Sequence, residues 1–222
     1  ARARKVADEK GVVLAEAMTL YHMPIYKKLS DLVTSGALGK LRFVQMNFGS
    51  YKDYDMKNRF FNRSLAGGAL LDIGVYALSF VRYFMSAQPD QIASQVLRAP
   101  TGVDEQAGIL LQNKEGEMAT LALSLHAKQP KRGMAAFDKG YIEIYDYPRA
   151  EEATITYTED GRKEVIREGS TAKALQYEVL DMEQAVSNGG KGMCQEYTKD
   201  VMDLMTAIRQ QWGLTYPEEE QA

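Results

Sequence analysis

The sequence predicts an α+β fold: a large, open, mainly antiparallel sheet with helices on one face, preceded by the last helix and strand of a separate α/β unit. Between Gln91 and Arg167, short apolar runs alternate with glycine-containing turns, the pattern of successive antiparallel strands. On either side of that region, longer stretches carry apolar residues at spacings of three and four, which is the pattern of helices that bury one face.

The first eighteen residues predict the end of a parallel-sheet domain. Ala1–Lys10 is rich in helix formers, Gly11 is a plausible stop, and Val12–Ala15 is a short apolar run suited to a buried strand. A helix followed by a buried strand is the end of a βαβ pattern. We therefore divide the chain into residues 1–18 and a domain of residues 19–222. A chain that lacks its front is the preferred interpretation; a small appendage on a complete domain is the alternative.

Three elements are expected before the main run of strands. A helix is predicted over Pro24–Thr34, opened by its proline. Leu41–Phe48 alternates in a way that leaves apolar residues on both sides, which predicts a strand covered on both faces or part of an interface. The length of the apolar stretch Ala69–Met85 favours a buried helix.

The second half of the chain supplies most of the predicted sheet and two closing helices. Strands are expected at Ile92–Leu97, Gln106–Leu111, Met118–Leu125, Met134–Phe137, Tyr141–Tyr145, Ala153–Tyr157 and Lys163–Arg167. The closing helices are marked by Leu175, Val179, Met182 and Val186, and by Val201, Leu204, Met205, Ile208 and Trp212. An open sheet has a second face to cover, and we expect Val44, Phe48, Leu123 and Tyr145 to bury it against a second copy.

Composition excludes several classes of function. The 222 residues carry 27 Lys plus Arg against 30 Asp plus Glu, a net charge of −3, which argues against a sequence-independent nucleic-acid binder. No uninterrupted apolar run approaches the roughly 20 residues of a membrane span, so no membrane partner is expected. Cys194 has no partner for an internal disulfide, and two histidines are too few for a histidine-rich zinc site. A cytoplasmic location and no metal are expected.

The most unusual stretch is Gly67 to Tyr76. Paired glycines allow close backbone approach, as at the mouth of a ligand site. Asp72 and Tyr76 are four residues apart, so on a helix they project from the same face. A carboxylate on an otherwise apolar helix must face a polar cavity, a cation or a helix start. The alternative is a purely structural role, in which Asp72 is a helix-start residue and Tyr76 an ordinary core residue.

The stretch GGALLDIGVYAL at residues 67–78 closely resembles the signature helix of the Gfo/Idh/MocA oxidoreductases, in the Asp-x-Gly-x-Tyr form of its glucose–fructose oxidoreductase and dimeric dihydrodiol dehydrogenase branch. Further segments agree in the family's order: EKGVVLAEAM at 9–18, PIYKKLSDLVTSGALGKLRFVQMNF at 24–48 and GLTYP at 213–217. Ala66 departs from the pattern, because the family frequently has a third glycine there.

This resemblance implies the C-terminal domain of a two-domain NAD(P)-dependent dehydrogenase whose N-terminal domain is of the Rossmann type. Such enzymes transfer hydride between nicotinamide and a carbinol carbon of a sugar, polyol or diol, and use the open sheet to form homodimers or homotetramers. Tyr76 matches the position assigned to acid/base chemistry, and Asp72 the position that binds substrate or orients the catalytic groups. A free phenol, with a pKa near 10, is a poor base at neutral pH unless a cation stabilises its phenolate.

The family's Glu-Lys-Pro motif, which supplies that cation, is not in this sequence, and neither is a Gly-x-Gly-x-x-Gly fingerprint that follows a strand. We therefore expect the chain alone to bind no cofactor and to be inactive, with NAD or NADP bound only by the full-length protein. Gly189-Gly190-Lys191-Gly192 is expected to be a loop between helices. A catalytically silent dimerisation or small-molecule-binding module is the alternative function.

Six further residues are candidates of lower rank. Glu16 lies where a strand's carboxyl end would face the cofactor crevice, with structural pairing as the alternative. The candidates for substrate contact are Tyr21, His22, Arg59, Asn62 and Arg98. The family often has an aromatic residue followed by arginine at the first two of these positions, so their role departs from the pattern. A partly exposed histidine is the alternative for His22, and a solvated side chain is the alternative for Arg59, Asn62 and Arg98.

Overall fold

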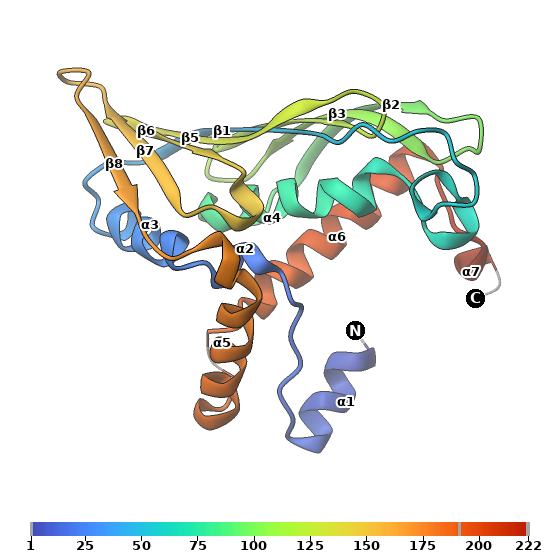
Figure 1. Ribbon diagram of the computed structural model, residues 1–222, viewed down its shortest axis with the longest axis horizontal. Coiled ribbons are helices and arrows are strands. Elements are labelled where there is room, and N and C mark those ends of the chain that lie inside the picture. The colour runs from blue at the N-terminus through green and yellow to red at the C-terminus, as the bar shows by residue number, and fades with distance from the viewer. Residues whose placement is uncertain (1, 191, 221–222) are drawn as a thin grey trace.

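Eight strands form a single open sheet, in the order β2-β3-β4-β1-β5-β6-β7-β8 (Figure 1). The computed structural model describes residues 2–190 and 192–220. β1 and β4 run parallel, and the other neighbouring pairs are antiparallel, so the predicted sheet is confirmed. The strands are β1 Leu41–Gly49, β2 Gln91–Arg98, β3 Asp104–Gln112, β4 Met118–Ser124, β5 Gln129–Phe137, β6 Gly140–Tyr145, β7 Glu152–Tyr157 and β8 Lys163–Arg167.

The helices lie on one side of this sheet, with α4 and α6 packed below its central and right-hand strands in the view of Figure 1. The α-helices are α1 Arg2–Lys10, α2 Thr19–His22, α3 Pro24–Thr34, α4 Val75–Phe84, α5 Ala174–Asn188, α6 Gln195–Trp212 and α7 Pro217–Glu220. Shorter turns are the 3-10 helices η1 Arg59–Phe61, η2 Arg63–Leu65, η4 Tyr147–Arg149 and η5 Thr171–Lys173, and the π-helix η3 Leu70–Gly74. The helix Pro24–Thr34 is confirmed with the predicted bounds.

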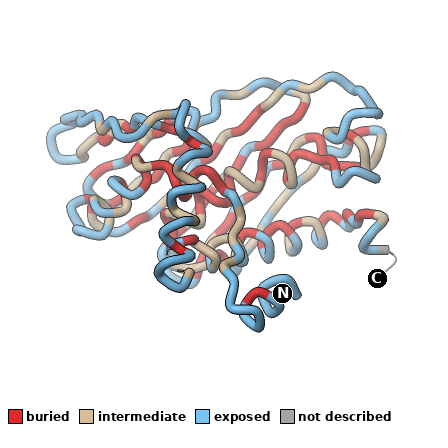
Figure 2. Tube along the Cα trace, turned by 60° about the horizontal axis from the view of Figure 1, so that its bottom comes forward, coloured by how far each residue is buried: buried red, intermediate tan, exposed pale blue. Residues whose placement is uncertain are grey.

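The core lies between the sheet and this helical layer, where the strands and helices carry the buried residues (Figure 2). Phe80 of α4 packs directly on β5 at Gly133, where a Cβ atom would lie 2.6 Å from the aromatic ring. The buried Tyr26 hydroxyl donates a hydrogen bond to the carbonyl of Tyr147, at 2.7 Å. This bond ties α3 to η4, the turn that follows β6.

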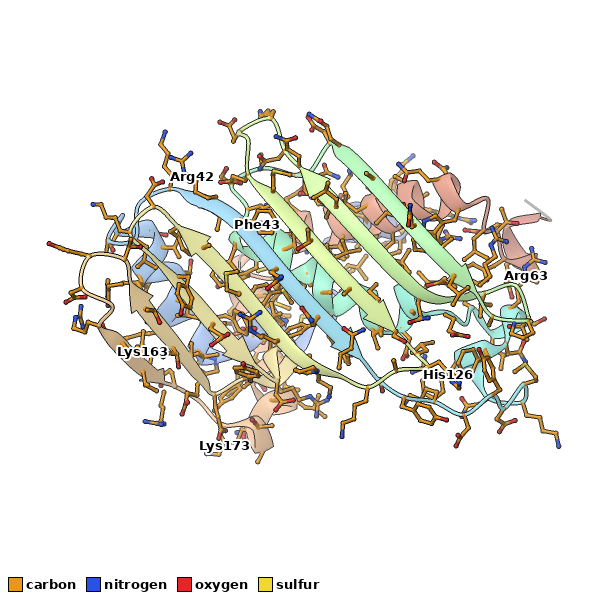
Figure 3. The ribbon with its side chains drawn as sticks, turned by 90° about the horizontal axis from the view of Figure 1, so that it is seen from above. Arg42, Phe43, Arg63, His126, Lys163 and Lys173 are labelled. Carbon is orange, nitrogen blue, oxygen red and sulfur yellow. The ribbon has the colours of Figure 1, made fainter. Side chains whose placement is uncertain are left out.

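The side chains that were expected to cover the second face of the sheet mostly point the other way. Val44, Phe48 and Leu123 are buried towards the helices, so that expectation is wrong for these three residues. The strand register places Phe43, Gln45 and Asn47 of β1 on the open face, and Figure 3, which looks onto that face, shows Phe43 near the start of this central strand. Tyr145 is 56% exposed there, as predicted. One face of β1 is therefore covered by this chain and the other is not.

The first residues of the chain form a helix, but the apolar run that follows this helix does not form a strand. α1 confirms the predicted helix, whereas the run Val12–Ala15 is part of a connecting segment that joins no strand ladder of the described chain. Val12 and Leu14 are exposed, so the expectation of a buried strand is wrong for this structure. A strand needs a hydrogen-bonding neighbour, and none of the eight described strands lies beside this segment.

The helix α5 carries its apolar stripe on the outside. α5 and α1 project away from the sheet and its helical layer (Figure 1), and only Ala174 and Ala185 of α5 are buried. Leu175, Val179 and Val186, the residues that predicted this helix, are each more than half exposed. The sequence predicted the helix correctly, but the described residues do not bury its apolar face.

The segment Arg63–Phe84 is long and apolar enough to meet the composition test for a membrane-spanning helix. Most of it is buried inside the protein, against β1 and the other central strands. The paired glycines and the change from a π-helix to an α-helix also interrupt it. These features are those of a core helix.

Candidate functional site

The start of the predicted signature helix is a glycine turn with no room for side chains. A Cβ atom at Gly67 would lie 2.4 Å from the Arg59 carbonyl oxygen. Gly68 has a φ of +123°, and a Cβ atom there would lie 2.0 Å from Oδ1 of Asp104. The two glycines are therefore required by contact with neighbouring backbone and with one carboxyl group. Ala66, just before them, adopts a left-handed conformation with φ 54°, which is unfavourable for alanine and suits the glycine that the family frequently has.

Asp104 fixes the first turn of the helix. This fully buried residue begins β3, and its Oδ2 accepts a hydrogen bond from the backbone amide of Leu70, at 2.6 Å. Burial raises the pKa of the Asp104 carboxyl to about 7, although the amides of Leu70 and Ala69 partly offset this by favouring the charged form. The amide donors and the positive end of the helix dipole make this a suitable place for a carboxyl group.

A second side chain holds the same turn from the C-terminal end of the chain. The Tyr216 hydroxyl donates a buried hydrogen bond to the Gly67 carbonyl, at 2.7 Å. Arg209 lies over the Tyr216 ring and forms two bonds with Glu219, at 2.8 and 2.7 Å. This pairing lowers the pKa of the Glu219 carboxyl to about 2. The GLTYP segment thus anchors the glycine turn.

Asp72 lies in the π-helix η3 and is neutralised by a cation. Its Oδ1 is 2.5 Å from Nη2 of Arg59, and the Arg59 guanidinium also lies over the ring of Phe60. The Asp72 side chain is 13% exposed and the Arg59 side chain 60%, so the pair is accessible at its arginine end. The predicted need for a cation partner is met. The wider π-turn changes the spacing of side chains relative to an α-helix.

Tyr76 is half-buried on the first turn of α4 and faces a pocket. Its ring centroid is 6.2 Å from that of Phe48, and its hydroxyl makes no hydrogen bond with the residues that the structure describes. The pocket has a volume of about 470 Å³. Its described lining residues are Phe48, Tyr76, Lys131, Asp146, Pro148, Arg149 and Thr171. Asp72 is not one of them, so Asp72 and Tyr76 follow one another on the helix without lining this pocket together.

Tyr21 and His22 lie at the far end of α4. Tyr21 is buried and stacks on Tyr83, seven residues beyond Tyr76 and about 10 Å along the helix. His22 is 1% exposed, and its Nδ1 lies 2.8 Å from Oδ2 of Asp181 on α5. Neither side chain lines the Tyr76 pocket. The alternative of a partly exposed His22 is wrong, because α2 packs directly on α5.

The other candidates occupy three separate places. Burial raises the pKa of the half-buried Glu16 carboxyl, which lies beside Thr198 of α6. Asn62 caps η2 by accepting a hydrogen bond from Ser64 N, at 2.9 Å. Arg98, at the end of β2, donates to the carbonyl of Trp212. Of the predicted site residues, the structure therefore brings together Arg59 with Asp72, and places Asn62 in the same loop.

Four important residues were not predicted from the sequence. Asp104 and Tyr216 hold the glycine turn, and Lys131 and Arg149 line the Tyr76 pocket. The GLTYP segment carries part of the family resemblance, but nothing in its spacing indicates that its tyrosine reaches Gly67. Among residues 2–190 and 192–220, no group of three or more metal-ligating side chains gathers at one place.

A comparison with protein families matches residues 26–145 to the GFO/IDH/MocA C-terminal domain. A trans-1,2-dihydrobenzene-1,2-diol dehydrogenase from Xenopus tropicalis is 28% identical over 220 residues, which cover 95% of this chain and 66% of that protein. The corresponding enzyme from Sus scrofa is 32% identical over 141 residues, covering 63% of this chain and 42% of that protein. The chain therefore spans less than two thirds of the length of these relatives.

Solved structures share the fold. A 3-ketoreductase from Actinomadura kijaniata, in complex with NADP and TDP-benzene, superposes with a TM-score of 0.77 at 20% identity, covering 94% of this chain and 65% of that one. An aldose-aldose oxidoreductase from Caulobacter crescentus, complexed with glycerol, has a TM-score of 0.76 at 21% identity, covering 91% and 62%. At this identity the likeness shows the fold.

The raised pKa of Asp104 predicts how the free energy of unfolding depends on pH. Its pKa of about 7 in the folded protein exceeds the value of about 3.9 expected in the unfolded chain. Between these values the folded state keeps a proton that the unfolded state has lost, so the free energy of unfolding should fall as pH rises from about 4 to about 7. Asp104→Asn should flatten this decline in urea unfolding measured across that range.

The matched control is Asp53→Asn, an exposed loop carboxyl, which should leave the decline unchanged. Asp104→Ala leaves the Leu70 amide without its acceptor and should cost about 1–3 kcal/mol. If the free energy of unfolding falls with pH equally steeply in the wild type and in Asp104→Asn, the raised pKa does not belong to Asp104.

Proposed function

The chain belongs to the Gfo/Idh/MocA family, and we propose that it is the C-terminal part of an NAD(P)-dependent oxidoreductase. The full-length enzyme transfers hydride between nicotinamide and a carbinol carbon of a sugar, polyol or diol. The names of the relatives support this class: they are a trans-1,2-dihydrobenzene-1,2-diol dehydrogenase, a 3-ketoreductase and an aldose-aldose oxidoreductase. The present chain alone is proposed to be inactive.

The observation that carries the proposal is the position of the Tyr76 phenol. It is half-buried, lines a pocket and has no hydrogen-bond partner among the described residues, so its oxygen is available to a ligand. Oxidation of an alcohol requires a group that accepts the hydroxyl proton as hydride leaves the carbon. Tyr76 is proposed to accept that proton in its phenolate form, which a nearby cation stabilises, and to return it from the neutral phenol in the reverse reaction.

Asp72 is proposed to position the catalytic groups. Its pairing with Arg59 at 2.5 Å removes the cost of an isolated carboxylate beside the apolar helix. The pair also joins the loop that contains Arg59 and Asn62 to the helix that contains Tyr76. Arg59 and Asn62 are proposed to contact the substrate when their loop closes on the pocket.

The described residues do not fit a dinucleotide. Gly189 and Gly190 follow helix α5 rather than a strand, so they do not form the strand–turn–helix cradle that holds a pyrophosphate. We therefore assign NAD or NADP to a domain of the full-length protein, of which residues 1–18 are the end, with Glu16 at the junction. The exposed apolar stripe of α5, with Val12 and Leu14, supports this assignment, because such surfaces are usually covered.

The open face of the sheet is proposed to form a homodimer or a homotetramer. The strand register places several exposed or half-exposed apolar side chains on it, and small residues near its centre leave it flat. The apolar side chains are Phe43, Leu97, Leu110, Tyr141 and Val165. A flat apolar face of this kind suits a self-complementary interface.

Tyr76→Phe in the full-length protein removes the proton-accepting oxygen and keeps the ring. The turnover number for a diol or sugar with NAD(P)⁺ should fall by about 10²–10⁴-fold. Tyr141→Phe on the open face is the matched control and should retain turnover. Unchanged turnover in Tyr76→Phe would show that the tyrosine assignment is wrong, and failure of the full-length protein to bind NAD(P)H would favour a silent module.

Leu110→Glu places a charge within the proposed interface, on β3. Its side chain is 38% exposed in the single chain, so the monomer should tolerate the change. Light scattering should show the wild type as a dimer or tetramer and the variant as a smaller species. Leu175→Glu, on α5, is the control and should keep the assembly. A monomeric wild type would disprove the interface.

A further inference from the structure

Two cations, Lys131 and Arg149, line the pocket in front of Tyr76. Lys131 comes from the start of β5, and Arg149 from the turn η4 that follows β6. Lys131 lies over the ring of Phe48, 5.3 Å from its centroid, and Phe48 in turn packs against Tyr76. The ammonium group is therefore held close to the aromatic wall beside the proposed catalytic phenol.

Neither cation is neutralised within the described part of the chain. Lys131 and Arg149 form no ion pair there, in contrast to most arginines of the protein. The neighbouring glutamates are already engaged: Glu143 pairs with Arg132 at 2.5 Å and Glu152 with Arg167 at 2.7 Å.

The third acid of this region is also occupied. Glu151 accepts a hydrogen bond from the backbone amide of Thr171, at 2.7 Å. The charged side chains left lining the pocket are therefore Lys131 and Arg149 against the single carboxylate of Asp146, which is a net positive charge.

A second depression continues the first and adds another cation. It has a volume of about 560 Å³ and shares Lys131 and Asp146 with the Tyr76 pocket, and Lys128 lines it as well. The two depressions together thus present three cations and one carboxylate, Asp146. Asp146 has a φ of 46°, a left-handed backbone conformation that aspartate tolerates better than most residues.

We propose that this pocket takes an anionic substrate: a sugar or polyol that carries a carboxylate or a phosphate group. The inference rests on the proposed function, since it places the reacting carbinol at Tyr76 and the anion against Lys131 and Arg149. Arginine and lysine are the side chains that recognise carboxylate and phosphate. A neutral diol would leave both cations without a counter-charge in the complex.

Calorimetric titration of the chain with three matched probes tests the proposal. D-Glucuronate carries a carboxylate on C6, D-glucose 6-phosphate carries a phosphate there, and D-glucose carries neither. Both anions should bind at least about tenfold more tightly than glucose, and the tighter of the two identifies the preferred group. This preference should shrink when salt is raised from about 0.05 to about 0.5 M, because charge pairing at an exposed site is screened.

The variant Lys131→Met/Arg149→Met should lose the preference for anions, and Lys131→Arg should keep it. Lys139→Met/Lys163→Met, which removes two exposed charges elsewhere, is the matched control and should bind like the wild type. Figure 3 shows Lys163 on β8, at the edge of the sheet. Equal binding of glucose and the anions, no binding of any probe, or an unchanged preference in the double variant would overturn the proposal.

The two proposals fail separately. A preference for anions in a protein whose turnover is unaffected by Tyr76→Phe would retain the anion site and reject the redox role. Turnover lost in Tyr76→Phe, with no preference for anions, would retain the redox role and reject the anionic substrate.

Discussion

The geometry of the candidate site depends on one buried carboxyl group. Asp104 lies where the glycine turn meets the first turn of the helix, and it accepts the Leu70 amide at 2.6 Å while filling the space beside Gly68. A buried amide without a partner is costly, and so is a buried carboxyl without donors. The Leu70 amide and Oδ2 of Asp104 satisfy each other, and the helix that carries Asp72 and Tyr76 starts at a fixed place as a result.

The sheet and the C-terminal segment complete this arrangement. Asp104 begins β3, so the helix start is tied to the sheet, and Tyr216 ties Gly67 to the end of the chain. Tyr76 then packs against Phe48 of β1, and Lys131 comes from the neighbouring strand β5. The proposed chemistry needs this rigidity, because a proton acceptor must lie within hydrogen-bond reach of its substrate.

Much of the fold follows from local sequence, and less of the site does. Alternation and glycine-containing turns predicted every strand from β1 to β8, because these signals act between neighbouring residues. The direction in which Val44, Phe48 and Leu123 face was mistaken, since both sides of β1 carry apolar residues and alternation alone does not choose between them. Family resemblance indicated Tyr76 and Asp72, but contacts such as Asp104 with Gly68 join residues 36 apart and leave no local pattern.

A double-mutant cycle between Gly68 and Asp104 tests most directly whether this contact fixes the helix start. Gly68→Ala places its Cβ atom 2.0 Å from Asp104 Oδ1 and must displace the carboxyl group, so it removes what Asp104→Ala removes. We expect the free energies of unfolding to be strongly non-additive, with the double variant hardly less stable than Gly68→Ala alone and a coupling of at least about 0.5 kcal/mol. Simple addition of the two losses would contradict it.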